Sequence, residues 1–158
     1  MNIFALNLVL ALVWAALWSD FSVYQMVSGY LVGFGALWLA QPLFGQDSPY
    51  FRRAYRVVRL VVYFVYELVV SSIQVAWDVL TPTDLSTPKI LEMPLDVESD
   101  IEILLVTNLI SLTPGTLSID ITPDRKTLFV HAMFADDPDA QIAALKSGME
   151  RMVKEVFE

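Results

Sequence analysis

The strongest constraint on this chain is the near absence of charge from its amino-terminal third. Asp20 is the sole charged side chain among residues 1–46. Two apolar runs, residues 2–18 and 22–44, are separated by the short segment Ser-Asp-Phe-Ser. Because about 20 apolar residues suffice for a helix to cross the hydrocarbon core of a bilayer, the pattern predicts a membrane-embedded helical hairpin. Its first helix is short for a full span.

Three glycines in the second apolar run are candidate helix-packing positions: Gly29, Gly33 and Gly35. The first two form a G-x-x-x-G pattern, which removes side chains from one stripe of a helix and lets another helix approach. Glycine is also common in membrane helices without any packing role. Both interpretations are compatible with the sequence.

A third apolar segment, residues 51–80, opens with a cluster of four arginines. Its polar side chains recur at intervals of three, four and seven residues, which places them on one helical face. They are Arg56, Tyr63, Glu67, Ser71, Gln74 and Asp78. This helix either spans the membrane with the polar stripe against partner subunits, or lies along the interface with the stripe toward water.

Glu67 is the acid in the middle of this apolar segment. A carboxylate within a membrane is a candidate for an ion or proton path. The alternatives are pairing with an arginine, for which Arg56 and Arg59 are the candidates, or an interfacial position without a special role. The arginine cluster is expected on the cytoplasmic side by the positive-inside rule.

The carboxyl-terminal half has the composition of a water-soluble domain. Residues 81–158 contain fourteen acids and six bases, and the whole chain has a net charge of −8. Such a balance argues against a nucleic-acid partner, because phosphate binding requires a basic surface. The chain has no cysteine, which excludes disulfides and thiolate chemistry.

Residues 81–88 are rich in Pro, Thr and Asp and predict a linker between a membrane part, 1–80, and an α+β module, 89–158. The predicted order in the module is strand, helix, strand, strand, helix, with the helices on one face of the sheet. The strands are expected at 89–97, 117–122 and 127–135, and the helices at 99–112 and 139–158. Ser99 and Asp137 are the expected N-caps, and Pro138 the first position of the last helix.

The segment 113–122 predicts a turn that leads into a hairpin. Pro114 and Gly115 fit a type II turn, in which the third residue needs a positive φ. Leu117, Ile119 and Ile121 alternate with polar residues and are expected on the buried face of the sheet. His131 is isolated on the next strand, and a structural role is favoured over a proton-relay role.

The sequence contains no nucleophile elbow, phosphate loop or metal-ligand cluster. We therefore expect no catalytic residues, no cofactor and no metal site, and an enzyme is disfavoured.

The segment Thr113-Pro114-Gly115-Thr116, with His131 downstream and the hydrophobic segments upstream, resembles the E subunit of the Mrp-type multisubunit Na⁺/H⁺ antiporters. The resemblance extends over nearly the whole chain and marks these five residues as a structural motif of the family. It implies an accessory, non-catalytic subunit of the cell membrane that supports the assembly and activity of the complex. It also implies other antiporter subunits and the lipid bilayer as partners, and a cytoplasmic α+β module. From the residues alone, a standalone membrane-anchored binding or regulatory adaptor stays open.

Overall fold

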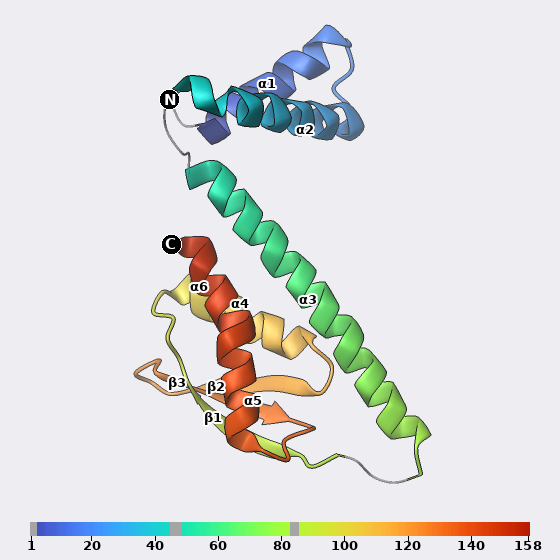
Figure 1. The fold of residues 1–158 in the computed structure, drawn as a ribbon, viewed down its shortest axis with the longest axis vertical. Coiled ribbons are helices and arrows are strands. Elements are labelled where there is room, and N and C mark those ends of the chain that lie inside the picture. Colours follow the sequence, from blue (N-terminus) through green and yellow to red (C-terminus); the bar gives the residue numbers. More distant parts are fainter. Residues whose placement is uncertain (1–2, 45–48, 83–85) are drawn as a thin grey trace. The chain divides into compact units, whose positions relative to one another are not determined.

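The computed structural model describes residues 3–44, 49–82 and 86–158 (Figure 1). Its contacts divide the chain into two units, Met1–Tyr55 and Arg56–Glu158. The boundary falls inside the long helix α3 (Pro49–Leu80), which contributes to both units.

The first unit is built on a helical hairpin, as predicted from the two apolar runs. Helix α1 (Ile3–Leu17) packs against α2 (Val23–Ala40). The turn between them uses a left-handed residue, Ser19, with φ 50°. The Asp20 carboxylate accepts hydrogen bonds from the backbone N–H of Ser22 at 2.9 Å and from its hydroxyl at 3.0 Å. Ser22 in turn caps α2.

Within the described residues, α2 and α3 are the helices long and apolar enough to cross a membrane by length and composition. Helix α1 has 15 residues, or about 22 Å, which is short for a span. Helix α2 gives way to a short 3₁₀ helix, η1 (Gln41–Phe44), where Pro42 lacks the N–H that a continuing α-helix would use.

The second unit contains a three-stranded antiparallel sheet with helices packed against it, which confirms the predicted fold class. The strand order is β1-β3-β2. The elements are β1 (Lys89–Pro94), α4 (Asp100–Leu112), β2 (Thr116–Ile121), β3 (Thr127–Ala132), α5 (Pro138–Leu145), η2 (Lys146–Glu150) and α6 (Arg151–Phe157). Helix α4 contacts β2, and α5 contacts β1 (Figure 1).

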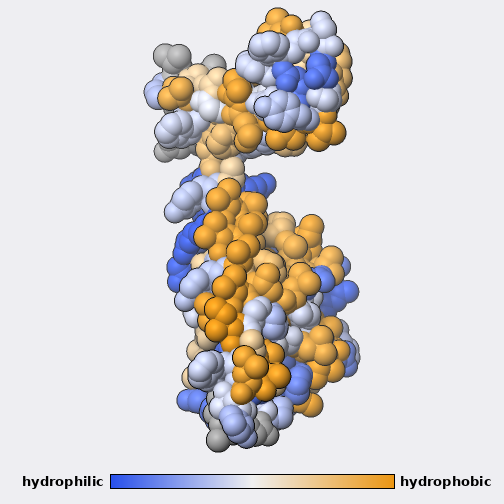
Figure 2. Space-filling model, turned by 90° about the vertical axis from the view of Figure 1, so that its right-hand side faces the viewer, coloured by the Kyte–Doolittle hydropathy of each residue, from blue (hydrophilic) through white to orange (hydrophobic). Residues whose placement is uncertain are grey.

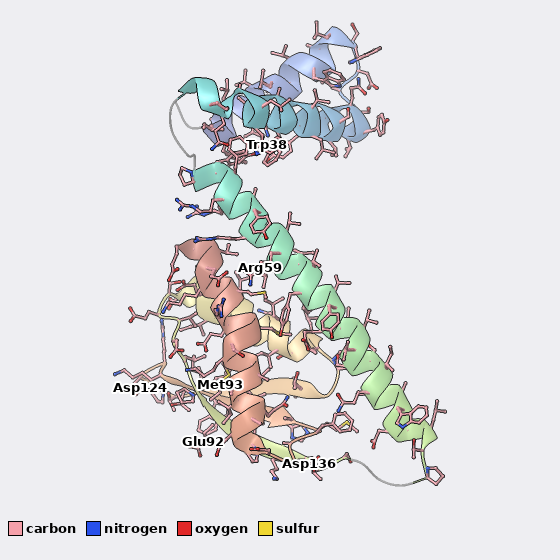
Figure 3. The ribbon with its side chains drawn as sticks, viewed as in Figure 1. Trp38, Arg59, Glu92, Met93, Asp124 and Asp136 are labelled. Carbon is pink, nitrogen blue, oxygen red and sulfur yellow. The ribbon has the colours of Figure 1, made fainter. Side chains whose placement is uncertain are left out.

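One face of the sheet forms the core. Leu91 and Met93 of β1 lie opposite Val130 and Leu128 of β3, and all four are buried. Glu92, between the first two, is exposed on the other face (Figure 3). The alternation of buried and exposed residues follows the two-residue period of a strand and shows that the helices cover a single face.

The predicted helix starts are confirmed. The Ser99 hydroxyl and the Glu102 carboxylate form a reciprocal capping box at α4. The Asp137 carboxylate accepts from the N–H groups of Asp139 and Ala140 at 3.1 Å, and Pro138 is the first residue of α5.

The last helix departs from a regular α-helix at η2, where residues 146–150 form a turn of π-helix. Gly148, Met149 and Glu150 are buried in this turn. The π turn is a rare conformation that inserts one extra residue and rotates the side chains that follow it. No feature of the sequence pattern indicated it.

The prediction for strand β2 was wrong at two positions. Leu117 and Ile119 are each 52% exposed, whereas the polar Ser118 faces helix α4 and donates to the Thr107 carbonyl at 3.1 Å. A β-bulge between Ser118 and Asp120 then shifts the register, so that Ile121 returns to the core side. The Ser118 side of β2 therefore faces α4, to which it is hydrogen-bonded through both its hydroxyl and its N–H.

Candidate functional site

The polar stripe of α3 faces the chain's own α+β module. Arg56, Tyr63, Glu67 and Ser71 are half-buried, whereas the valines on the opposite side of the helix are exposed. Leu60, Tyr63 and Phe64 pack against the core of the module. The two orientations expected from the sequence placed the stripe against partner subunits or toward water, and neither expectation included the chain's own module, toward which Arg56, Tyr63, Glu67 and Ser71 point, whereas Gln74 is exposed.

Two arginines of α3 hold the end of the carboxyl-terminal helix. The Arg56 guanidinium donates to the backbone carbonyl of Glu155 at 2.6 Å, and that of Arg59 lies 3.0 Å from the Glu155 carboxylate. Figure 3 shows Arg59 on the side of α3 that faces α6. Arg151 binds the same carboxylate at 2.9 Å and, with the charge of Arg59, lowers the pKa of Glu155. These arginines therefore bind Glu155 rather than Glu67.

Glu67 lies in the middle of the contact between α3 and the module. It lies one turn after Tyr63, and its backbone carbonyl accepts from the Ser71 hydroxyl at 2.6 Å. A cavity of 210 Å³ opens beside it. From α3 the cavity is lined by Tyr63, Glu67, Val70, Ser71 and Gln74, and from the module by Thr113–Thr116, Phe134, Gln141, Ala144, Leu145 and Met149.

The cavity joins two features that the sequence presented separately, Glu67 and the Thr-Pro-Gly-Thr segment. The segment terminates α4. The Thr113 hydroxyl donates to the Leu109 carbonyl at 2.9 Å, and the Thr116 hydroxyl donates to the Ile110 carbonyl at 2.6 Å. Both bonds satisfy carbonyls that the end of a helix leaves without an intrahelical partner.

Gly115 completes the turn with φ +88°, a conformation that favours glycine. Its carbonyl accepts from the Met133 N–H at 2.7 Å, which ties the turn to the end of β3. A Cβ on Gly115 would touch the Phe134 ring and Val75 of α3 at 3.6–3.7 Å. The Thr-Pro-Gly-Thr segment thus terminates α4 and also lies next to α3 at Val75.

His131 does not take part in this arrangement. It lies on β3, between Ile90 of β1 and Leu117 of β2 in the register of the sheet. Ile90 and Leu117 are exposed on the face that the helices leave open.

The three glycines of α2 differ in their surroundings. A Cβ on Gly29 would lie 2.8 Å from the Trp14 Cβ, and one on Gly33 would overlap the Asn7 side chain. A Cβ on Gly35 would meet nothing within 4 Å among the described atoms. Two of the three therefore lie where α1 approaches α2 closely.

A buried polar cluster in the first unit was missed from the sequence. Asn7 is fully buried, and its Nδ2 donates to the Tyr50 hydroxyl at 3.1 Å. That hydroxyl lies 2.6 Å from the hydroxyl of Tyr30. The aromatic rings of Phe34 and Phe51 pack against Tyr50. A lone Asn inside an apolar run, as at Asn7, was the available signal.

Glu150 is a second buried polar group that sequence reasoning missed. Its side chain is 1% exposed, and its Oε1 accepts from the N–H groups of Asp96 at 2.5 Å and Val97 at 3.3 Å. Burial raises the pKa of this carboxyl, against the opposing effect of those hydrogen bonds and of Lys146. The Glu150 carboxylate thus links residues 96–97, which follow β1, to the π turn.

Among the described residues, no group of three or more His, Cys, Asp and Glu side chains is arranged to hold a metal ion.

Apolar helices of membrane-spanning length beside a small α+β module are typical of a membrane protein with an additional folded domain. The chain belongs to the Na⁺/H⁺ ion antiporter subunit (MNHE) family, which it matches over residues 7–156. The resemblance to the E subunit is therefore confirmed. The E1 subunit of the Na⁺/H⁺ antiporter of Staphylococcus haemolyticus is 32% identical over 156 residues, with 97% of this chain and 96% of that protein covered. The corresponding E subunit of Alkalihalophilus pseudofirmus is 33% identical, with 96% of this chain and 95% of that protein covered.

Two solved structures are similar to the chain. One is the Mrp complex of Dietzia sp. DQ12-45-1b, with 29% identity over 61% of this chain and 90% of the matched chain, and a TM-score of 0.47. The other is the membrane-bound sulfane sulfur reductase, an archaeal respiratory membrane complex, with 20% identity over 99% of this chain and 100% of the matched chain. Its TM-score of 0.59 supports a shared fold.

Proposed function

We propose that this chain is an accessory, non-catalytic subunit of a multisubunit Na⁺/H⁺ antiporter in the cell membrane, which supports assembly and activity of the complex and does not carry the ions. Its partners are the other antiporter subunits and the lipid bilayer. The α1–α2 hairpin is the multi-pass membrane part, and the α+β module lies on the cytoplasmic side.

The observation that carries this proposal is the lack of acidic, basic and histidine side chains in the hairpin helices, where an ion path would need them. Ion and proton paths through membranes use carboxylates or other titratable side chains within the bilayer. In α1 and α2 there is no Asp, Glu, Lys, Arg or His, and Asp20 lies in the turn between the two helices. The Asn7 amide nitrogen and the Tyr30 hydroxyl are hydrogen-bonded to the Tyr50 hydroxyl.

The charged groups of α3 support the same conclusion. Arg56 and Arg59 bind Glu155 of the module, and Glu67 and Tyr63 both line the 210 Å³ cavity. The two arginines link the module to α3, which is a structural task. The hairpin and the module therefore support a role of the chain in assembly of the complex.

The test is purification of the tagged chain from its native membranes in mild detergent, combined with Na⁺/H⁺ antiport measured in everted vesicles. Removal of the chain is expected to lower both antiport and the recovery of the other hydrophobic subunits. Glu67→Gln is expected to leave assembly and antiport in place. A stable, partner-free monomer would favour the membrane-anchored adaptor, and normal assembly with lost antiport in the Glu67→Gln variant would assign Glu67 to the ion path.

A further inference from the structure

Helix α3 has two sides of opposite character. At about 100° per residue, Val58, Val62, Val65 and Val69 fall within a sector of roughly 60°, and Glu67 points away from its centre. The four valines are 49–63% exposed. Figure 2 looks onto this side of the second unit, where hydrophobic side chains form a stripe along α3. We call this stripe, from Val58 to Ile73, the outer face of α3.

The opposite side of α3 meets the module at separate points along residues 56–75, with the 210 Å³ cavity between them. The contacts begin with Arg56 at the Glu155 carbonyl, continue with Tyr63 over Gly148, and reach Val75 beside Gly115. From residue 56 to residue 75 a helix rises about 28 Å, which is close to the thickness of the hydrocarbon core.

This contact rules out a transmembrane orientation for residues 56–75 in the described arrangement. If that stretch crossed the bilayer, the module beside it would lie in hydrocarbon together with exposed charged side chains such as Arg151 and Lys154. Each charge in the bilayer centre costs at least about 2.5–3.5 kcal/mol. The five residues that remain after Val75 are too few to span.

The side chains along the outer face of α3 indicate that it contacts lipid. Tyr66 and Trp77 lie along one edge of the valine sector and are 59% and 64% exposed. Aromatic residues with a polar end are favoured at the level of lipid headgroups. Ser72, near the other edge, donates its hydroxyl to the Leu68 carbonyl at 2.5 Å, so that its polar group is satisfied by the helix itself.

We propose that the outer face of α3 is a lipid-binding surface, on which the second unit lies flat against one side of the bilayer. The valines and Ile73 enter the boundary between headgroups and acyl chains, and the acidic module remains in water. The hairpin is then the only part of the described chain that can span. The inference rests on the packing of the second unit and is independent of any role in ion transport.

The test uses nitroxide spin labels on cysteines introduced one at a time into the full chain, which has no cysteine of its own. The labelled chain is placed in vesicles of phosphatidylethanolamine and phosphatidylglycerol. Collision rates are then measured with oxygen, which concentrates among acyl chains, and with a water-soluble nickel chelate. Val58→Cys, Val65→Cys and Ile73→Cys sample roughly 22 Å of the outer face.

A flat orientation predicts the same shallow depth at the three positions, with oxygen collisions favoured over the nickel chelate at each. Leu31→Cys on α2 serves as the deep reference, and Asp124→Cys on the exposed hairpin turn as the aqueous reference. A depth that changes steadily from Val58 to Ile73 would show a spanning helix and overturn the proposal. Low collision rates with both reagents would show a face covered by protein, which also overturns it.

Discussion

The ring of Tyr63 on α3 occupies the space directly over the backbone of Gly148 in the π turn. A Cβ on Gly148 would lie 3.0 Å from the Tyr63 Cζ and 3.3 Å from its Cε1, and closer still to the hydroxyl. The absence of a side chain at Gly148 therefore permits α3 to approach the carboxyl-terminal helix. The same π turn directs Glu150 into the module.

Gly148→Ala is expected to destabilise the second unit. The added methyl group must displace the Tyr63 ring, and overpacking of this kind costs about 1–3 kcal/mol. The gain in helix propensity, about 0.5–1 kcal/mol, is smaller. Thermal unfolding of the full chain in mild detergent measures the effect. Ser147→Ala, on the exposed side of the same turn, is the control, and combining Gly148→Ala with Tyr63→Phe should recover part of the loss. An unchanged midpoint in Gly148→Ala would contradict the contact.

Glu150 is expected to make the stability of the second unit depend on pH. Its pKa in the folded chain is raised above the ordinary 4.5, so the unfolded chain loses this proton at lower pH than the folded one. The contribution of Glu150 to stability is therefore greatest below pH 4.5 and falls as the pH rises through the folded-state pKa. Two charged groups face the Glu150 carboxyl: Lys146, which lowers its pKa, and Asp96, which raises it.

Glu150→Gln should remove this decline, because an amide does not titrate and its oxygen can still accept from Asp96 and Val97. Glu150→Ala should instead cost about 1–3 kcal/mol across the pH range, because it leaves the buried N–H of Val97 and the partly buried N–H of Asp96 without an acceptor. Unfolding midpoints measured between acidic and neutral pH distinguish the two variants. Parallel pH profiles for Glu150→Gln and the parent chain would refute the assignment.

Local rules were sufficient for much of the fold. Ser99 and Asp137 were identifiable as caps, because a short polar side chain followed by an apolar run satisfies the free N–H groups of a helix whatever surrounds it. Pro114 and Gly115 were identifiable as a turn for a similar reason, since Gly115 has the positive φ that few other residues adopt. Such signals depend on the backbone within a few residues.

The candidate site depended on tertiary contacts that no local pattern records. The period of the polar stripe on α3 was correct, but its partner is a module that begins nine residues after the helix ends. From the sequence pattern, Glu150 would be expected on the exposed face of an amphipathic helix. The π turn instead places it in the interior. Likewise Ser118 points toward α4, where its hydroxyl donates to the Thr107 carbonyl, a partner eleven residues away in the sequence.

Gly33→Leu is expected to disrupt the helical hairpin. A Cβ at Gly33 would overlap the buried Asn7 side chain and lie 3.2 Å from the Leu10 Cβ, so a larger side chain must separate α1 from α2. Recovery of the chain and of the subunits that co-purify with it should fall. Gly35→Leu is the matched control two residues away, because a Cβ there meets nothing within 4 Å among the described atoms. Equal recovery of both variants would show that this contact is not required.

The two arginines of α3 should differ in their contributions and in their response to salt. Arg56 donates to a backbone carbonyl at 2.6 Å, and a hydrogen bond from a charged donor contributes about 1.5–3 kcal/mol. Arg59 forms a partly exposed ion pair with Glu155, of a kind that contributes about 0.2–1 kcal/mol. We therefore expect Arg56→Ala to lower the unfolding midpoint of the second unit more than Arg59→Ala.

The loss in Arg59→Ala should shrink at about 1 M salt, where the screening length is about 3 Å. The loss in Arg56→Ala should persist, because its acceptor is uncharged. Equal losses with equal salt dependence would mean that the arginines act only through their charge.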